Sequence, residues 1–408
     1  MRPLTKTRTL LYSAGSVGAG AFFAFNNFVL PQLLKASGAG DLLTGLLSST
    51  RSIEGVLIQP TVGALSDRTR SRLGRRRPFI LVGIPLSAAF FLFAAGRHDV
   101  LGLTIGIVLF SICFNVAADP YVALLADITT LGERGVLSGV ATLIQLASQV
   151  SFLAAISFAT RDGGIPDWSY GLVAALMIAT FGVTVVGIRE PEVEPAGSQK
   201  QRLGARAYVA EITGNVQAIR YLATVFVFMV GFSAVLPYLT LFLTVDILLS
   251  EQVALAIAAG TLLVTGMSAA AAGPLADRIG AKPVLAIGWT LLALAAFVGL
   301  LVRGLPDTAA VVLVAGIGNG AATAVGWPLL ASLIPPEKTG VFAGLKAAAE
   351  SIAIPASVFI AAVVFIPRFS YRGVFALLAA TILIALVLLI RYVHAPTPPP
   401  FRADGQVA

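Results

Sequence analysis

Long apolar segments recur along almost the whole chain and are separated by short turns that carry most of the charge. Each segment is about 18 residues or longer, which is enough for a helix to cross roughly 30 Å of hydrocarbon. The pattern predicts an all-α integral membrane protein with twelve transmembrane helices. The predicted spans are residues 9–34, 42–65, 78–95, 100–125, 135–160, 169–188, 221–245, 252–275, 283–302, 308–332, 340–366 and 372–393.

The composition agrees with lipid as the main solvent. Hydrophobic residues make up 57% of the chain and charged residues only 12%. A soluble enzyme of ordinary composition has about twice that charged fraction, so this class is excluded. The first apolar segment is too long for a signal-peptide core and precedes no small-residue cleavage site. We therefore expect it to remain in the protein as a spanning helix.

Lysine and arginine are distributed unevenly between the turns. Of 28 such residues, 20 lie in the termini and the even-to-odd turns, whereas 6 lie in the opposite turns. The positive-inside rule therefore predicts that both termini are cytoplasmic, and we expect the chain in the plasma (inner) membrane. The net charge of +8 is densest where anionic headgroups would lie, so the lipid bilayer is the expected partner and nucleic acid is not.

Neither metal nor nucleotide chemistry is expected. The two histidines and Cys113 lack the spacing of metal ligands, and one cysteine provides no intrachain disulfide. The chain lacks the GxxxxGK[ST] loop that cradles ATP phosphates. We therefore expect no cofactor, no ATP and no enzymatic activity. The expected coupling ion is a proton, with sodium as the alternative, and we expect the chain to act as a monomer.

An arginine-rich turn recurs in the second half of the chain. Residues 63–78 read GALSDRTRSRLGRRRP, and residues 273–282 read GPLADRIGAK. The sequence Asn115-x-Ala-Ala likewise recurs from Asn319. All matched positions are between 204 and 210 residues apart. This order indicates a duplicated membrane protein, which is the architecture of transporters whose two parallel six-helix halves rock around a central site.

The longest polar connection separates the two repeats. We predict an N-terminal six-helix half at 1–188, a cytoplasmic linker at 189–220 and a C-terminal six-helix half at 221–394. The Pro-rich tail at 395–408 cannot continue a helix and is predicted to be disordered.

The segment RLGRRRPFI at residues 72–80 resembles the corresponding segment of the sucrose and related proton-sugar symporters of the major facilitator superfamily. The turn at 69–74 is more distantly similar to the glycoside-pentoside-hexuronide cation symporters. In the fourth span, Pro120-x-x-Ala-Leu-Leu-Ala-Asp127 is similar to the PxRALLAD motif of the sucrose carriers. Where those carriers have an arginine and an acidic residue, this chain has Val122 and Ser111.

The resemblance implies a gating role for the recurring turn. It implies that Asp67 and Arg68 latch the two halves in the outward-facing state, with Asp67 near Gly340. A solvated loop that only sets orientation is the alternative. The predicted gating residues are Gly63, Asp67, Arg68, Gly74, Arg75, Arg76, Gly273, Asp277 and Arg278.

Five ionisable residues lie well inside predicted spans, away from the span ends, and a charge costs about 2.5–3.5 kcal/mol at the helix centre. Arg51 and Glu54 are three residues apart, and Lys346 and Glu350 are four apart, so each pair shares a helix face. We predict that the two pairs exchange partners as the halves rock. Two local ion pairs are the alternative. Asp119 precedes Pro120 and is the expected protonatable coupling residue, with a carboxylate that caps the proline kink as the alternative.

Amides and aromatic rings lie on the spans that line the cavity in such proteins. Amides satisfy hydroxyl groups, and a ring face stacks on sugar C–H groups, so this set suits a polyhydroxylated ligand. Contacts that only join helices are the alternative. The predicted substrate-binding residues are Asn26, Asn27, Asn115, Gln145, Tyr238, Asn319, Thr323 and Trp327, and Gln149 adds an amide.

Together these patterns predict a secondary active transporter that moves a small polar solute by alternating access. A sugar or glycoside with proton coupling is the favoured substrate. A proton-driven antiporter that exports a drug or metabolite is the alternative within the same fold. A receptor or lipid-moving protein would need a large extra domain or a wide apolar cleft, and the sequence indicates neither.

Overall fold

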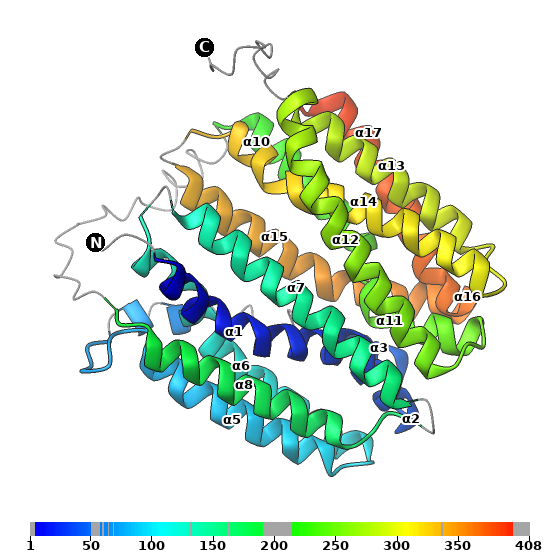
Figure 1. The fold of residues 1–408 in the computed structure, drawn as a ribbon. Coiled ribbons are helices and arrows are strands. Elements are labelled where there is room, and N and C mark those ends of the chain that lie inside the picture. The colour runs from blue at the N-terminus through cyan, green and yellow to red at the C-terminus, as the bar shows by residue number, and fades with distance from the viewer. Residues whose placement is uncertain are drawn as a thin grey trace. The chain divides into compact units, whose positions relative to one another are not determined.

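Helices form all of the secondary structure in the part of the chain that the computed structural model describes (Figure 1). Of the predicted site residues, Arg51, Glu54 and Arg68 lie outside the described residues, as do the tail at 395–408 and most of the linker. The described residues are 5–49, 58, 61–63, 65–67, 69–130, 133–160, 164–190, 214–335 and 338–394.

The helices of the first half follow the predicted apolar segments closely from residue 77 onwards. Between residues 6 and 36, a π-helical turn divides the first span into shorter pieces. The elements are α1 (Lys6–Ala24), η1 (Phe25–Val29), α2 (Leu30–Ala36), α3 (Asp41–Ser48), α5 (Arg77–Ala95), α6 (Val100–Ile128), α7 (Arg134–Ala159) and α8 (Trp168–Gly187).

The second half repeats this order of long helices. Its elements are α10 (Val216–Phe232), α11 (Val235–Leu241), η3 (Phe242–Asp246), α12 (Glu251–Ile279), α13 (Ala281–Gly299), α14 (Leu305–Ser332), α15 (Thr339–Ile360), η5 (Ala361–Phe365), α16 (Ile366–Phe369), η6 (Ser370–Arg372) and α17 (Gly373–Tyr392).

Ten segments of the described chain are long and apolar enough to cross a membrane. One of them, Val341–Tyr392, is 52 residues long and covers all but one residue of each of two predicted spans, 340–366 and 372–393. The predicted span at 42–65 is described only in part, through α3 and a few residues near its end. The chain is therefore a multi-pass helical protein, while the count of twelve spans and the side on which the termini lie stay predictions.

The chain divides into two compact units. The first unit contains residues 1–197 with 236–244 and 250–259, and the second contains 198–235, 245–249 and 260–408. Within the first unit, α5 packs along α6 and α8, and α1 packs against α7 and α8 (Figure 1). Within the second unit, α13 packs along α14 and α17, and α10 packs against α17 and α15.

Aromatic rings fill the centre of each unit. In the first unit, Phe22 and Phe91 both contact Phe110, with ring centroids 4.5 and 5.1 Å away. In the second unit, the buried Trp289 stacks on Phe228 with centroids 4.8 Å apart. These rings form cores that join helices distant in sequence, so each unit has its own apolar interior.

Small residues allow the helices of the first unit to approach closely. A Cβ atom at Gly20 of α1 would lie 2.4 Å from the Gln145 carbonyl oxygen of α7 and 2.8 Å from the Ser148 Cβ. The helix backbones therefore meet where any side chain at this position would clash, which is a common way of packing helices in lipid.

We expect Gly20→Val to destabilise the protein by about 1–3 kcal/mol more than Gly139→Val, because overpacking forces α1 and α7 apart. Gly139 of α7 is the matched control, since a Cβ there meets nothing within 4 Å. Thermal unfolding of the detergent-solubilised variants measures the difference. Equal unfolding midpoints would contradict this packing.

Candidate functional site

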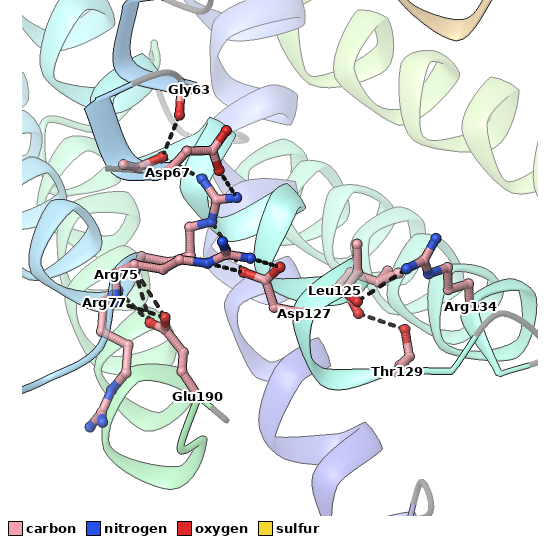
Figure 2. A network of polar contacts seen from close by, with 12 residues as sticks. Gly63, Asp67, Arg75, Arg77, Leu125, Asp127, Thr129, Arg134 and Glu190 are labelled. Carbon is pink, nitrogen blue, oxygen red and sulfur yellow. Dashed lines mark hydrogen bonds and ion pairs between the residues drawn. The ribbon is translucent and has the colours of Figure 1, made fainter. Parts of the chain in front are cut away.

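A carboxylate caps the first turn of α5. The backbone N–H groups of Arg75, Arg76 and Arg77 donate to the Glu190 carboxylate, at 2.7, 3.0 and 2.9 Å (Figure 2). Glu190 lies just beyond the end of α8, so this contact joins the ends of two packed helices. The exposed N–H groups and the helix dipole make a helix N-terminus a favourable place for a negative charge.

Asp127, near the end of α6, binds two arginine side chains at once. The Arg75 Nε donates to Asp127 Oδ2 at 3.1 Å, and a second Arg75 nitrogen binds the other carboxylate oxygen. The Arg76 Nε also donates to Oδ2, at 3.2 Å. The side chains of Arg76 and Asp127 are 7% and 10% exposed, so this ion pair is nearly excluded from solvent.

The far end of the Arg76 guanidinium contacts the segment that precedes the turn. Its two terminal nitrogens bind the Asp67 carboxylate and the hydroxyl of Ser66. The Asp67 side chain is 58% exposed, whereas Ser66 is fully buried. Arg76 therefore lies between a buried and an exposed carboxylate, and Asp67 is the more accessible member of this cluster.

Gly74 fits this site for two reasons. Its φ of +103° lies in the region that favours glycine. A Cβ atom there would also lie 2.6 Å from the carboxylate carbon of Glu190. Any other residue would therefore push Glu190 away from the start of α5.

These contacts form one charged cluster, which comprises Asp67, Arg75, Arg76, Asp127 and Glu190. Within it, each charge is stabilised by neighbours of opposite sign. Burial by itself lowers the pKa of the Arg75 guanidinium. The hydrogen bond to Asp127 and the charges of Asp127, Asp67 and Glu190 outweigh burial and raise that pKa above its ordinary value. Arg75 consequently stays charged at any pH the protein meets. The cluster is a permanent electrostatic junction of α5, α6 and the end of α8.

The sequence motif contains only part of this cluster. Asp67, Gly74, Arg75 and Arg76 are among the predicted gating residues, but the motif assigns no role to Asp127 or Glu190. Asp127 ends the motif that begins at Pro120, which is the one signal for it. Glu190 has a weaker signal in the sequence. It is an acidic residue at the end of an apolar segment, at a position where the positive-inside rule favours lysine or arginine.

The equivalent turn of the second unit is less elaborate. Asp277 and Arg278 lie in the last turn of α12, and Gly280 follows with a φ of +93°. None of the ion pairs between described residues includes Asp277 or Arg278. A Cβ atom at Gly63 or Gly273 would meet no described residue within 4 Å. The buried network is thus described in the first unit alone.

The second unit contains an ion pair inside a span. Lys346 and Glu350 of α15 bind each other one helical turn apart, with side chains 25% and 13% exposed. In the first unit, Asp119 is partly buried in α6, directly before Pro120. It follows Asn115 by four residues, so the two share a face of the helix.

The predicted substrate residues of the first unit are partly engaged with neighbouring backbone. Asn26 and Asn27 are buried in the π-helical turn η1, and Asn26 donates to the Ser48 carbonyl at 2.9 Å. Asn115 donates to the Ser111 carbonyl of its own helix, also at 2.9 Å. Gln145 is half-buried in α7. The role of these four amides in substrate binding stays a prediction.

Three predicted residues form a stripe on α14. Asn319, Thr323 and Trp327 recur every four residues and therefore lie on one helix face. Thr323 and Trp327 are exposed and Asn319 is half-buried. Tyr238 is fully buried instead, and its hydroxyl donates to the Asp41 carbonyl at 2.7 Å. This stripe presents an amide, a hydroxyl and an aromatic ring on one face of α14.

An apolar groove of about 420 Å³ lies between α1, α7 and α8. Its lining is hydrophobic apart from Ser148 and Ser151. Such a surface does not provide the amides that a polyhydroxylated ligand requires. Among the described residues, no group of three or more His, Cys, Asp or Glu could hold a metal ion.

Residues 11–366 match the sequence profile of the family described as MFS/sugar transport protein. The chain is 30% identical to proton-associated sugar transporter A of Homo sapiens over an alignment of 226 residues, which covers 49% of this chain and 30% of that protein. It is 25% identical to the lactose permease of Lactobacillus helveticus over an alignment of 231 residues, which covers 50% of this chain and 34% of that protein. The matched segments thus cover about a third of each relative.

Solved transporters share the fold. A D-xylose-proton symporter aligns with a TM-score of 0.72 at 16% identity, covering 97% of this chain and 99% of that chain. The nucleoside transporter NupG aligns with a TM-score of 0.73 at 12% identity, covering 95% of this chain and all of that chain (100%). At these identities the likeness concerns the fold alone.

We expect Asp127→Asn to destabilise the protein by about 3–5 kcal/mol, because it leaves two arginines facing each other without their shared carboxylate. Asp41→Asn is the control, since its ion pair with Lys35 is more exposed, at 27% and 38%, and contributes about 1 kcal/mol or less. Thermal unfolding compares them. Similar losses in the two variants would be inconsistent with a buried junction at Asp127.

Gly74→Ala should cost about 1–3 kcal/mol more than Gly164→Ala, because the new methyl group displaces Glu190 from three N–H donors. Gly164 is matched in backbone conformation, with a φ of +71°, but a Cβ there meets nothing within 4 Å. Thermal unfolding again measures the difference. If both alanine variants unfold at the same temperature, the position of Glu190 does not depend on Gly74.

Proposed function

We propose that this chain, which belongs to the MFS/sugar transport protein family, is a membrane transporter that carries a sugar or glycoside together with protons. The halves would alternate in exposing a central site to the two sides of the membrane. Several relatives bear names of this kind, among them a sucrose transport protein of Oryza sativa subsp. indica, 35% identical over 104 residues (25% of this chain and 17% of that protein).

The observation that carries the substrate class is the stripe on α14. Asn319 can both donate to and accept from hydroxyl groups, Thr323 adds a hydroxyl, and the exposed Trp327 offers an apolar ring face. A sugar presents hydroxyl groups around its edge and C–H groups on its faces, so it complements these groups in both respects. The amides of Asn26, Asn27, Asn115 and Gln145 would extend this recognition.

Ionisable groups inside the spans support coupling to an ion. A charged residue inside a membrane span costs free energy, so it is expected to have a partner or a function. We propose that Lys346 and Glu350 exchange partners with Arg51 and Glu54 during the cycle. Asp119 would carry the transported proton, since a carboxylate in a poorly solvated helix face changes its charge readily when its surroundings change.

The Asp127 cluster supports a rocking mechanism. It joins α5, α6 and the end of α8 into one body, so this end of the first unit would move as a rigid piece. The exposed Asp67 carboxylate remains accessible at its surface. We propose that this end is cytoplasmic and that Asp67 makes and breaks a contact with the other half as the cavity opens.

Counterflow into proteoliposomes tests the substrate class. Vesicles loaded with an unlabelled sugar should take up the same labelled sugar against its concentration, in a panel of hexoses, pentoses and disaccharides. Empty vesicles are the control. Absence of counterflow for every sugar would remove this proposal, and flux of a drug or metabolite against a proton gradient would favour the exporting antiporter.

Asp119→Asn should abolish uptake driven by a pH gradient while it preserves counterflow, because counterflow needs no net proton movement. Asp167→Asn is the control, since this exposed residue precedes α8 and its side chain caps no N–H group. Uptake is measured against external pH in both variants. If Asp119→Asn retains the pH dependence of the unmodified protein, Asp119 does not carry the proton.

A further inference from the structure

The apolar groove of the first unit lies between two helices that pack on a third. Both α7 and α8 pack along α1, while they have little direct contact with each other (Figure 1). Two glycines allow α1 to lie deep between them. A Cβ atom at Gly20 would lie 2.4 Å from the Gln145 carbonyl oxygen of α7, and one at Gly18 would lie 2.8 Å from the Met177 Cα of α8. The groove therefore has α1 as its floor, at Val17, and α7 and α8 as its walls.

The lining of this groove suits hydrocarbon. Among the described residues that line it, none carries a charge and only two serines are polar. The Ser148 hydroxyl donates to the Val17 carbonyl at 2.7 Å, so it is already engaged within the protein. Ala147, Ser151 and Ala155 recur every four residues of α7 and are exposed. Their small side chains leave the groove open along this face of the helix.

The groove extends through about half of the membrane. Its lining on α7 runs from Ile144 to Ala155, which is about 16 Å of helix at about 1.5 Å per residue. The hydrocarbon core is about 30 Å thick, so one leaflet contributes about 15 Å. Ala155 is one turn before the end of α7, and Leu172 is one turn after the start of α8. The groove thus runs from near these helix ends to the middle of the bilayer.

Aromatic side chains flank the end of the groove that is nearest the helix ends. Trp168 begins α8 and is 51% exposed, and Phe158 lies near the end of α7 and is 72% exposed. Trp168, Leu172 and Leu176 recur every four residues, so Trp168 lies on the face of α8 that lines the groove. Tryptophan is enriched where the headgroups of a membrane meet its hydrocarbon. This end of the groove is therefore the one that faces the headgroups.

We propose that this groove is a binding site for one acyl chain of a membrane phospholipid, whose headgroup lies beside Trp168. The depth of the groove selects this occupant. A transmembrane helix of a partner crosses both leaflets, whereas an acyl chain begins at the headgroup and ends at the bilayer centre. The site is separate from the polar stripe on α14 that carries the proposed sugar recognition.

Van der Waals contact provides the stabilisation. An acyl chain is surrounded by hydrocarbon before and after it binds, so the hydrophobic effect does not favour the groove over the bilayer. The groove instead offers close contact with three helices at once, and such contacts are individually weak but add up along a chain. A bound chain would fill the space between α7 and α8 and hold both helices against α1.

Quenching of tryptophan fluorescence tests the site. Phosphatidylcholine with brominated acyl chains is titrated into the delipidated full chain in detergent, because bromine quenches tryptophan at short range. The contribution of Trp168 is the difference between each protein and the same protein carrying Trp168→Phe. We expect quenching of Trp168 that saturates at one lipid per protein. Phosphatidylglycerol with the same chains should quench alike, since no charged residue lines the groove.

Ser151→Phe should abolish the saturable quenching, because the new ring fills the open face of the groove. Ser138→Phe is the matched control, since it makes the same change at another exposed serine of α7 that does not line the groove. It should be quenched like the unmodified protein. If Ser151→Phe does not fold, as judged by its thermal unfolding, Ala155→Phe takes its place.

Four results would overturn the proposal. They are quenching that never saturates in the unmodified protein, saturable quenching that persists when the groove is filled, and affinities for the two lipids that differ by an order of magnitude, which would assign recognition to the headgroup. The fourth is a mass of Ser151→Phe in detergent, by light scattering, that is half that of the unmodified protein, since the groove would then hold a second copy of the chain.

Discussion

The Asp127 carboxylate binds both Arg75 and Arg76, and the junction between the start of α5 and the end of α6 depends on it. The two guanidiniums would repel each other in a poorly solvated place if this carboxylate were absent. With it, the turn before α5 is pinned to the end of α6. Glu190 then completes the junction by accepting from the first N–H groups of α5. Three helix ends consequently share one network of charge and backbone.

This junction differs in kind from the polar groups inside the spans. At the helix ends, charges neutralise one another and hold the backbone in place. Within the spans, Asp119, Lys346 and Glu350 lie on helices that also contain proline, at Pro120 in α6 and Pro355 in α15. Rigid ends and bendable centres are the combination that a rocking transporter requires, since the halves must move as bodies while the central site changes shape.

The long helices and part of the Asp127 cluster can be predicted from the sequence alone. Apolar length alone predicts segments such as α7 and α8 to within about a residue, because lipid leaves a backbone few alternatives to the helix. The arginine motif indicates Arg75 and Arg76. It could not indicate Glu190, which lies 114 residues beyond Arg76, because a contact at that separation is set by the packing of α5 on α8. The sequence likewise could not indicate the bond from the Tyr221 hydroxyl to the Gly326 carbonyl, at 2.8 Å, because a backbone acceptor leaves no side-chain pattern.

The central claim is that sugar movement and proton movement are coupled in this protein. Addition of a transported sugar to de-energised vesicles, followed with a pH electrode in weakly buffered medium, measures this coupling directly. The account predicts that the medium becomes alkaline as sugar enters, and that an uncoupler abolishes the change. Sugar entry without any change of external pH, or acidification of the medium, would contradict proton-sugar symport.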